Sequence, residues 1–388
     1  MLSIPCVQDI DVAQTTVLFR VDLNVPIVDN QIENDFRLRS ITKTLDYLIA
    51  QKATVILVTH MGDPKKNNAP STRVLLTWFY KNGYSVVFAP DLDSAHALCA
   101  NTPPGIIMLE NIRLFAGEQN NDPLFAQRLA DLADCYVSDA FGAMHRTDSS
   151  LVTTPTLFAR GRKAAGFLVQ AEIKQLDALK HPEKPLTLVL GGAKPATKIP
   201  LIKEFLNKAD YILLCPALVF SFLAARHQQV GRSLIDRRAS TACNDILKQA
   251  EQSSTKVVMP IDYLVSDILF KPPFRIVDAQ KIGDQDFGLA IGPQTMRKYA
   301  FLLKQSKTIF LNGIMGDLAY KESLDQTHSV LNAMISSGAK TVVAGGDSVG
   351  ALYTFNLQDK IGYVSTGGGA ALAYLAGQEL PGLLALLS

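Results

Sequence analysis

The chain has 388 residues, of which 48% are hydrophobic and 19% are charged. This composition excludes a disordered chain, and the length favours two domains, because a single core rarely grows to this size. Lysine plus arginine number 38 against 36 for aspartate plus glutamate, a formal net charge of +2. We therefore expect neither nucleic acid nor an anionic membrane as a partner, and any anion site must be a local cluster.

Short apolar runs, typical of buried strands, recur along the chain with amphipathic, helix-like stretches between them. In the first half they lie at residues 15–21, 52–60, 84–90, 105–111 and 134–140. In the second half they lie at residues 186–192, 210–216, 256–262, 307–313, 340–346 and 361–369. Strands that alternate with helices predict an α/β fold with two doubly wound, Rossmann-like parallel sheets. The alternation pauses in a polar, helix-like segment, so we place an interdomain hinge at residues 166–184.

The five cysteines are odd in number and lack close pairing, which favours free thiols in a reducing compartment and argues against a zinc site. The first ten residues, MLSIPCVQDI, contain no basic region followed by an apolar stretch. No uncharged apolar segment long enough to span a membrane occurs in the sequence. We expect a cytoplasmic protein.

Polar and basic residues follow the predicted strands of the first half. Taken singly, an arginine is most often solvated or salt-bridged, and a histidine is most often structural. Collected at the carboxyl edge of one parallel sheet, they predict a pocket for a small, highly charged carboxylate or phosphate, which guanidinium forks bind bidentately. The residues are Arg20, Asp22, Asn24, His60, Arg113, His145 and Arg146, with Arg37 and Arg39 on a loop or helix start after the first strand.

Glycines take the corresponding places in the second half, in the stretches LGGAK, LNGIMG, AGGDS and VSTGGGAA. Glycine-rich turns between a strand and a helix present backbone N–H groups to phosphates. Asp347 in the third of these stretches is placed to hold a magnesium ion, although a helix N-cap is the alternative for this residue.

Lys194 and Lys198 stand four residues apart around Pro195, after the strand-like run LTLVL. If a helix begins near Pro195, both charges lie on one face at its N-terminus, where they repel each other and oppose the helix dipole. Either an anion binds there or the two lysines are solvated on a surface turn, and this stretch alone leaves both interpretations open.

Eight ordered motifs across essentially the whole chain resemble the phosphoglycerate kinase family. They are RVDLNVP, ENIRLFAGE, SDAFGAMHR, LGGAKPATK, LNGIMG, AGGDS, VSTGGGAAL and GQELPGLLAL. The resemblance implies an N-terminal phosphoglycerate-binding domain (residues 1–165), a C-terminal nucleotide-binding domain (185–372) and a tail (373–388) that packs back on the first domain. It also implies a monomer that closes about its hinge and transfers a phosphoryl group between 1,3-bisphosphoglycerate with Mg-ADP and 3-phosphoglycerate with Mg-ATP.

The resemblance also implies residue roles. The phosphoglycerate site would be formed by Asp22, Asn24, Arg37, His60, Arg113 and Arg146. The nucleotide site would be formed by Lys194, Lys198, Asn312, Gly346, Asp347, Ser348, Gly367, Gly368 and Gly369. Arg37, Lys198 and Gly368 would stabilise the phosphoryl group in transfer, and Asp347 would bind Mg²⁺.

Several positions depart from the family pattern. Asp63 replaces an arginine of the phosphoglycerate site, where Lys65 or Lys66 is a possible substitute. The other departures lie on the base and ribose side. Residues 215–218 (Cys-Pro-Ala-Leu) replace a Gly-Gly-Gly-Met run, and Ala319 replaces a ribose-contacting glutamate. In addition, Ile314 stands in place of a proline, Ala373 in place of a glutamate and Ala290 in place of an aspartate. Groups that bind phosphoryl oxygens are kept while those that bind base and ribose change, which predicts a weaker or differently selective nucleotide site.

Two hypotheses follow from this pattern. The leading one is an active phosphoglycerate kinase, with altered nucleotide preference as one possibility. The alternative is a catalytically weakened paralogue that binds phosphoglycerate or regulates another process. A nicotinamide-dependent dehydrogenase is disfavoured, because no Gly-x-Gly-x-x-Gly opens a helix with an acidic residue about 20 positions later.

Overall fold

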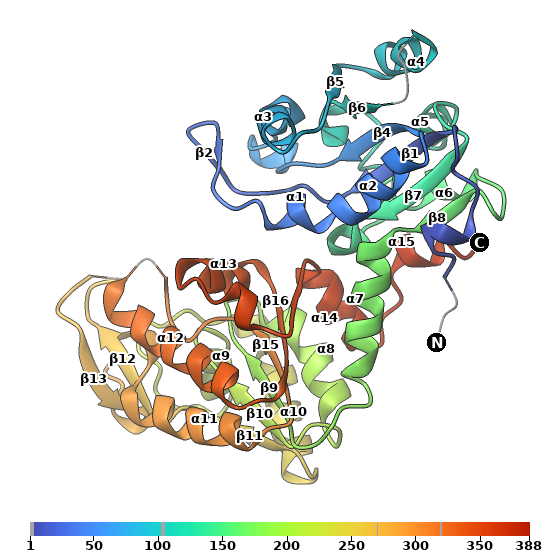
Figure 1. Cartoon of the computed structure of the whole chain (residues 1–388). Helices are drawn as coiled ribbons and strands as arrows, with labels where there is room; N and C mark the ends of the chain where they lie inside the picture. Colours follow the sequence, from blue (N-terminus) through green and yellow to red (C-terminus); the bar gives the residue numbers. More distant parts are fainter. Residues whose placement is uncertain (1–3, 102–104, 270, 319) are drawn as a thin grey trace. The chain divides into compact units, whose positions relative to one another are not determined.

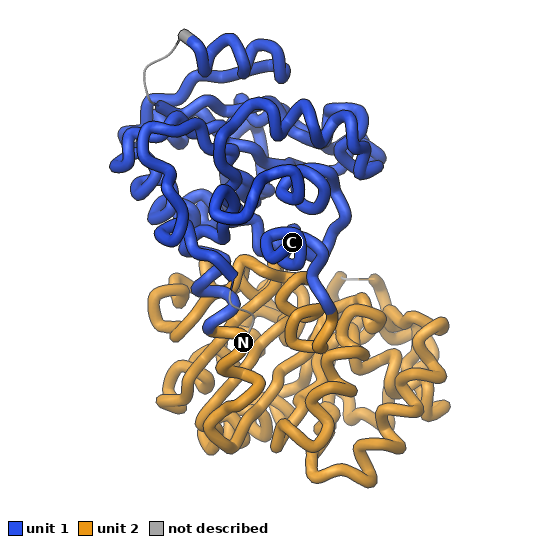
Figure 2. The backbone as a smooth tube through the Cα atoms, turned by 90° about the vertical axis from the view of Figure 1, so that its right-hand side faces the viewer, with its two compact units in different colours: residues 1–174, 379–388 blue, residues 175–378 orange. Residues whose placement is uncertain are grey.

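The computed structural model describes residues 4–101, 105–269, 271–318 and 320–388 (Figure 1). The chain forms two compact units: unit 1 comprises Met1–Lys174 and Glu379–Ser388, and unit 2 comprises Gln175–Gln378 (Figure 2). The division falls inside helix α7 (Phe167–Ala178). This division lies within the predicted hinge, residues 166–184. The predicted tail, residues 373–388, begins within unit 2, and only Glu379–Ser388 belong to unit 1.

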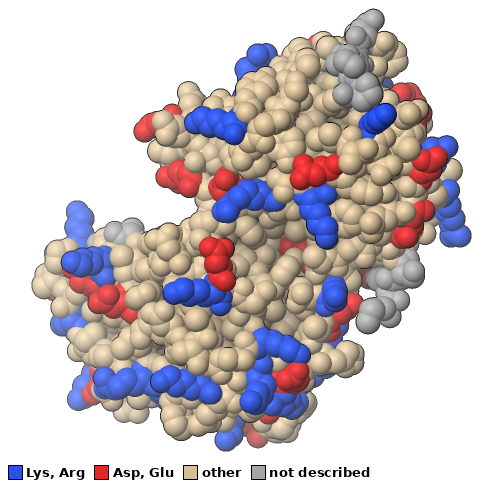
Figure 3. All heavy atoms as spheres, viewed as in Figure 1, with Lys and Arg blue, Asp and Glu red and all other residues tan. Residues whose placement is uncertain are grey.

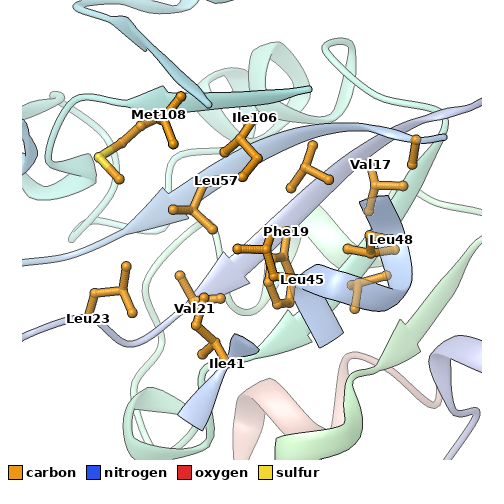
Figure 4. Packing of buried hydrophobic residues seen from close by; sticks show 14 of the residues in the cluster. Val17, Phe19, Val21, Leu23, Ile41, Leu45, Leu48, Leu57, Ile106 and Met108 are labelled. Atoms are coloured by element: carbon orange, nitrogen blue, oxygen red, sulfur yellow. The ribbon is translucent and has the colours of Figure 1, made fainter. Parts of the chain in front are cut away.

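Unit 1 is built on a six-stranded parallel sheet in the order β5-β6-β4-β1-β7-β8. The central strand β1 is fully buried from its second residue on, because both faces of the sheet are covered. Figure 4 shows Val17, Phe19 and Val21 of this strand packed with Leu45 and Leu48 of helix α2. The strands are β1 (Thr16–Val21), β4 (Thr54–Thr59), β5 (Val86–Ala89), β6 (Ile106–Leu109), β7 (Cys135–Asp139) and β8 (Lys163–Ala165).

The start of helix α5 in unit 1 is capped by a side chain. Helix α5 begins at Pro123, and the side chain of Asp122 accepts hydrogen bonds from the backbone N–H groups of Leu124 and Phe125. The remaining elements of the unit are the hairpin β2 (Ile27–Val28) and β3 (Gln31–Ile32), with helices α1 (Phe36–Ser40), α2 (Thr42–Ala50), α3 (Leu76–Lys81), α4 (Leu92–Asn101), α5 (Pro123–Ala130), α6 (Thr153–Thr156) and α15 (Pro381–Leu384).

The C-terminal residues are joined to unit 1 by polar contacts. The backbone N–H of Gly382 in α15 donates to the carbonyl oxygen of Met144 at 3.0 Å. The ammonium of Lys163 donates to the hydroxyl of Ser388 at 3.1 Å. These bonds hold the end of the chain beside the loop that follows β7.

Unit 2 is built on a second six-stranded parallel sheet, in the order β11-β10-β9-β15-β16-β17. Its strands are β9 (Leu186–Leu190), β10 (Tyr211–Leu214), β11 (Lys256–Val258), β15 (Thr308–Asn312), β16 (Lys340–Ala344) and β17 (Tyr363–Ser365). The helices are α8 (Pro195–Phe205), α9 (Leu218–Ala225), α10 (Ser240–Glu251), α11 (Pro293–Gln305), α12 (Lys321–Ser336), α13 (Gly346–Thr354) and α14 (Gly368–Leu375). All eleven strands expected from the apolar runs are present, so the predicted fold class is confirmed.

A three-stranded antiparallel sheet in unit 2 was not predicted. It consists of β12 (Asp262–Ser266) between β13 (Arg275–Asp278) and β14 (Phe287–Ile291). Three of the four residues of β13 are exposed, so this strand lacks the apolar pattern by which the eleven predicted strands were found. Strands β12 and β14 are mostly buried and were missed as well.

The described part of the chain contains no helix long and apolar enough to cross a membrane. On the face shown in Figure 3, acidic and basic side chains are interspersed. This mixture agrees with the small net charge and favours local anion sites over a broad basic surface.

The carboxylate of Asp139 is buried at the start of α7. Its Oδ1 accepts the backbone N–H of Val169 at 3.1 Å, and a Cβ added to Gly166 would lie 2.3 Å from both carboxylate oxygens. Burial raises the pKa of Asp139 to about 7, and hydrogen bonds from Thr44 and the helix backbone only partly oppose this effect. The folded state therefore holds a proton that the unfolded state releases near pH 3.8.

We expect Asp139→Asn to flatten the dependence of unfolding free energy on pH. Because the folded pKa is raised, the stabilisation from the protonated carboxyl is fully present below pH 3.8 and is lost as pH rises to about 7. A pKa difference of about 3 corresponds to about 4 kcal/mol. Thermal unfolding of the wild type, Asp139→Asn and the exposed control Asp93→Asn across this range measures the effect. If the unfolding free energies of the wild type and Asp139→Asn changed in parallel with pH, the pH dependence would have to come from other groups.

Candidate functional site

The polar residues predicted in the first half follow the carboxyl ends of four strands of the unit 1 sheet, β6-β4-β1-β7. Neighbouring parallel strands end at one edge, so these side chains gather there. We call this group the basic edge: Asp22 and Asn24 after β1, His60 after β4, Arg113 after β6, Arg146 after β7, and Arg37 on α1.

Asp22 organises one half of the basic edge. Its Oδ1 accepts a hydrogen bond from Nη1 of Arg37 at 2.6 Å and lies 3.9 Å from Nδ1 of His60. Burial raises the pKa of Asp22, but Arg37 and His60 outweigh it and hold this pKa below 3.8. Burial keeps the pKa of His60 well below 6.5, although Asp22 opposes that shift. At neutral pH this half of the basic edge therefore contains an ionised Asp22, a neutral His60 and a cationic Arg37.

Arg113 organises the other half. Its Nη1 donates to the carbonyl oxygen of Gly62, and the N–H of Gly62 donates to Oδ1 of Asn24 at 2.9 Å, so the loops after β1, β4 and β6 are linked. Its Nη2 lies 3.6 Å from Oδ2 of Asp148. Burial, and then the neighbouring charge of Arg146, lower the pKa of Arg113.

Sequence reasoning missed Asp148. This residue stands two positions after Arg146, and its sequence surroundings, HRTDSS, resemble an ordinary polar loop. Asp148 lies close to Arg113 because the fold brings the ends of β6 and β7 to one edge of the sheet, although the two residues are far apart in the chain.

Asp63, the departure from the family pattern, caps the short helix η2 (Pro64–Lys66), where its Oδ1 accepts the N–H of Lys65 at 3.1 Å. The side chains of Lys65 and Lys66 are exposed. The carboxylate of Asp63 is close enough to affect the pKa of Arg113. Asp63 therefore places a negative charge beside the basic edge, whereas the two lysines point to solvent.

A buried polar network lies behind the basic edge. Arg20 is fully buried and donates through Nε to the hydroxyl of Ser150 at 2.8 Å. That hydroxyl donates to Oε1 of Glu118 at 2.6 Å, and the N–H of Ser150 donates to Oε2 at 2.9 Å. Burial raises the pKa of Glu118, and the charge of Arg20 opposes it. The network fixes the loop that carries Arg146 and Asp148.

The glycine-rich turns of unit 2 lie at the carboxyl ends of β9, β15, β16 and β17, which are neighbours in the sheet. Gly313 has a φ of +130°, and an added Cβ would lie 2.5 Å from the backbone nitrogen of Gly191. Gly345 has a φ of +97°, and its added Cβ would lie 2.6 Å from Nδ2 of Asn312. Both positions require glycine because the chain takes a left-handed conformation against neighbouring atoms.

Three helix N-termini open at this edge: α8 at Pro195, α13 at Gly346 and α14 at Gly368. Their N-cap residues are Lys194, Gly345 and Gly367, so no N-cap side chain accepts a hydrogen bond from the first N–H groups of these helices. Such ends present N–H groups and partial positive charge to an anion. We call this arrangement the amide edge; it includes the predicted Gly346, Gly367, Gly368 and Gly369.

Asp347 lies in the first turn of α13, one residue beyond the helix start, so the N-cap alternative is wrong. The next residue, Ser348, is buried, accepts the N–H of Gly313 at 2.7 Å and donates to the carbonyl oxygen of Gly313 at 3.1 Å. Asn312 donates through Nδ2 to the carbonyl oxygen of Ala344 at 2.8 Å. Asn312 and Ser348 therefore fix the turns, and Asp347 stays exposed.

The two lysines occupy different environments. Lys194 is exposed at the N-cap of α8, whereas Lys198, one turn later, is half-buried. Burial lowers the pKa of Lys198, the charge of Asp347 opposes this shift, and Lys194 adds to it. The interpretation as a solvated surface lysine therefore fits Lys194 but not Lys198, which is half-buried and interacts with the charge of Asp347.

Residues 215–218 connect β10 to α9, on the other side of β9 from β15. The carbonyl oxygen of Pro216 accepts the N–H of Gly192 at 3.1 Å, and the buried Sγ of Cys215 lies 3.3 Å from Sδ of Met315. Leu218 is fully buried at the start of α9. The loop therefore carries apolar side chains next to the amide edge.

The other departures are spread over three elements. Ala290 is buried in β14, Ile314 is half-buried after β15, and Ala373 is half-buried in α14. An added Cβ at Gly316 would lie 2.5 Å from Cβ of Ala290, so these two positions are packed together. Ala319 lies outside the described residues.

These two edges suit different anions. The basic edge offers guanidinium groups with planar pairs of donors, which match a small carboxylate or phosphate. The amide edge offers three helix N-termini, two lysines and one carboxylate, which suits a chain of phosphates with a divalent cation.

Known proteins match this chain over nearly its whole length. A family model described as phosphoglycerate kinase matches residues 7–378. The cytosolic phosphoglycerate kinase 3 of Arabidopsis thaliana is 36% identical, with 99% of this chain and 98% of the relative covered, and the phosphoglycerate kinase of Thermosipho africanus is 37% identical, with 98% and 97% covered.

Solved structures agree in fold. The structure of phosphoglycerate kinase from Coxiella burnetii superposes with a TM-score of 0.83 at 31% identity, covering 99% of each chain. That from Pyrococcus horikoshii superposes with a TM-score of 0.86 at 27% identity, covering 98% of each chain. A match of sequence and fold along the whole length, together with a basic edge in one unit and an amide edge in the other, shows that this protein belongs to the phosphoglycerate kinase family.

Proposed function

We propose that the protein is an active phosphoglycerate kinase, which transfers a phosphoryl group reversibly between 1,3-bisphosphoglycerate with Mg-ADP and 3-phosphoglycerate with Mg-ATP in glycolysis and gluconeogenesis. The observation that carries this proposal is Lys198, half-buried at the N-terminus of α8 within the field of Asp347. A cation held in this way is suited to stabilise the negative charge of a phosphoryl group in transfer.

The basic edge is the proposed site for the glycerate substrate. Arg37, His60, Arg113 and Arg146 supply donors for its carboxylate and phosphate. Asp22 supports this proposal because its 2.6 Å bond fixes the guanidinium of Arg37. Asn24, which fixes Gly62, is the remaining polar group of the site.

The amide edge is the proposed site for the nucleotide phosphates, with Lys194, Asn312, Gly346, Ser348 and the amides of residues 367–369. Asp347 would hold Mg²⁺ at this edge. The donor set fits, because Mg²⁺ in kinases takes one or two carboxylates, with phosphate oxygens and water completing its shell. Bound Mg²⁺ would neutralise charge on the nucleotide phosphates.

The proposed mechanism needs no covalent intermediate on the enzyme. Attacking and leaving oxygens are aligned with the phosphorus, and Arg37, Lys198 and the N–H of Gly368 stabilise the equatorial oxygens. Because the two substrates bind to different units, transfer requires closure about the hinge segment, which also excludes water that would hydrolyse the acyl phosphate.

The paralogue hypothesis is not favoured, since full-length relatives are named phosphoglycerate kinase. Family membership also sets aside the dehydrogenase. We further propose a cytoplasmic monomer. Two relatives are named cytosolic, and all five cysteines are free thiols.

A coupled assay with purified protein, 3-phosphoglycerate and Mg-ATP tests the proposed function. We expect turnover that depends on both substrates and on Mg²⁺. No turnover with ATP, GTP, CTP or UTP would overturn the proposal, and calorimetric binding of 3-phosphoglycerate without nucleotide binding would support the paralogue instead.

We also predict weak discrimination between nucleobases. The groups kept from the family pattern are those that we propose bind phosphates, and residues 215–218 place apolar side chains and a proline where the resemblance implies glycines. A site that makes few hydrogen bonds to a base rejects the wrong base weakly, so kcat/KM for Mg-ATP and Mg-GTP should differ by less than about tenfold. Measuring both values in the same coupled assay checks this, and a ratio of roughly a thousand would indicate specific base recognition.

A further inference from the structure

Arg113 is a buried cation whose donors are incompletely used. Its side chain is 3% exposed, and its Nη1 donates to the carbonyl oxygen of Gly62. Within the part of the chain that the structure describes, Nε and Nη2 of Arg113 and Nε of Arg146 are buried without a hydrogen-bond partner. Buried donors of this kind are costly unless something accepts them, so they indicate where an anion binds.

The nearest carboxylate to these donors belongs to the protein. Oδ2 of Asp148 lies 3.6 Å from Nη2 of Arg113, and the Asp148 side chain is only 10% exposed. This distance is too long for a hydrogen bond, and among the described residues Oδ2 has no other hydrogen-bond partner. The pair of Arg37 and Asp22 is different, because it is joined at 2.6 Å.

The backbone holds Asp148 in this place. Its carbonyl oxygen accepts the N–H groups of Leu151 at 2.9 Å and Val152 at 3.1 Å. The buried Ser150, two residues after Asp148, is bonded to Glu118. These bonds fix the backbone of the turn that presents the Asp148 carboxylate to Arg113.

We propose that Asp148 is a built-in competitor of the glycerate substrate, a carboxylate that neutralises Arg113 in the free protein and weakens substrate affinity at the basic edge. The inference rests on the proposed function of that edge. An incoming carboxylate or phosphate that takes the free N–H groups of Arg113 comes close to Asp148, and two like charges in a partly desolvated site repel strongly. The negative charge of Asp63, like that of Asp148, interacts favourably with the positive charge of Arg113.

A positioning role is the competing explanation, in which Asp148 orients Arg113 for the substrate. A positioning carboxylate accepts short hydrogen bonds from the group it orients, as Asp22 does with Arg37. Asp148 makes no such bond to Arg113, and the carbonyl oxygen of Gly62 already orients the guanidinium. The geometry therefore points to competition.

The test is to measure 3-phosphoglycerate binding by calorimetry, and turnover in the coupled assay, for the full-length wild type and Asp148→Asn. We expect the variant to bind 3-phosphoglycerate about tenfold more tightly, since relief of a like-charge contact is worth at least this factor. KM for 3-phosphoglycerate should fall in parallel while kcat stays within about twofold, because the repulsion acts on ground and transition states alike.

Asp93→Asn is the matched control. It removes the same charge from an ion pair with Arg128 that is 3.0 Å long but exposed, so binding and turnover should not change. Asp148→Ser, which is smaller and also neutral, guards against a folding defect in the first variant, and a thermal unfolding curve for each protein verifies that it is folded.

Weaker or unchanged 3-phosphoglycerate binding in folded Asp148→Asn and Asp148→Ser, with the wild type active, would overturn the inference and leave the proposed function intact. Absence of 3-phosphoglycerate binding and turnover in the wild type would overturn the proposed function itself, and the inference with it. Tighter binding in both variants, with Asp93→Asn unchanged, would establish competition.

Discussion

Lys198→Ala is expected to lower kcat roughly 100- to 1,000-fold, with a much smaller change in KM for either substrate. The reason is the placement of Lys198 in a partly desolvated position at the N-terminus of α8, where its charge faces that of Asp347. A charge that stabilises mainly the transferring phosphoryl group contributes in the transition state more than in the ground state. The coupled assay at saturating 3-phosphoglycerate and Mg-ATP measures this loss.

Lys203→Ala is the control on the same helix. Lys203 is exposed in the last turn of α8, so its removal changes the net charge of the helix equally without touching the amide edge. We expect kcat to stay within about twofold of the wild type. Equal losses in the two variants would mean that the charge of α8 as a whole matters, and that Lys198 has no specific part in transfer.

The pH dependence of kcat/KM for Mg-ATP provides a second readout, because kcat/KM reports the protonation state of the free enzyme. Burial lowers the pKa of Lys198 below 10.5, so this lysine loses its charge at a lower pH than an exposed lysine does. Only the charged form stabilises the phosphoryl group, and therefore kcat/KM should decline on the alkaline side before an ordinary lysine titrates. Lys198→Arg should move this decline to higher pH, because a guanidinium keeps its proton throughout.

The sequence predicts most of the fold, because its information is local. Runs such as LTLVL and TVLFRV are buried on both faces of a parallel sheet, so each is predominantly apolar and can be found without knowing its partners. The amide edge is predictable for the same reason, since each glycine-rich turn joins a strand to the helix that follows it. Strand β13 is missed because its exposed residues show no such pattern.

What the sequence does not predict depends on contacts between distant residues. Asp148 meets Arg113 only after β6 and β7 reach one sheet edge, and nothing around Asp148 marks it as part of a charged site. Glu118 and Arg20 appear in recognisable motifs, yet their common partner Ser150 comes from a third segment. Residue types indicate the chemistry of a site, whereas the balance of charges within it requires the fold.

Glu118→Ala is expected to lower the free energy of unfolding by about 3–5 kcal/mol, the usual result of removing one partner from a buried charged network. Glu118 and Arg20 are both fully buried. Without the carboxylate, the hydroxyl and the N–H of Ser150 lose their acceptor, and Arg20 loses a compensating charge. Chemical denaturation, followed by a probe specific to unit 1 such as Trp78 fluorescence, measures the loss.

Glu251→Ala is the matched control, because it removes a glutamate from an ion pair with Arg226 that is exposed on both sides, and we expect about 0–1 kcal/mol. Glu118→Gln keeps an acceptor for Ser150 but removes the charge, and so separates the two contributions. A loss for Glu118→Gln close to that for Glu118→Ala would assign the stability to the charge that faces Arg20. A loss near zero would assign it to the hydrogen bonds of Ser150, and the loop that presents Arg146 and Asp148 would then depend on those bonds alone.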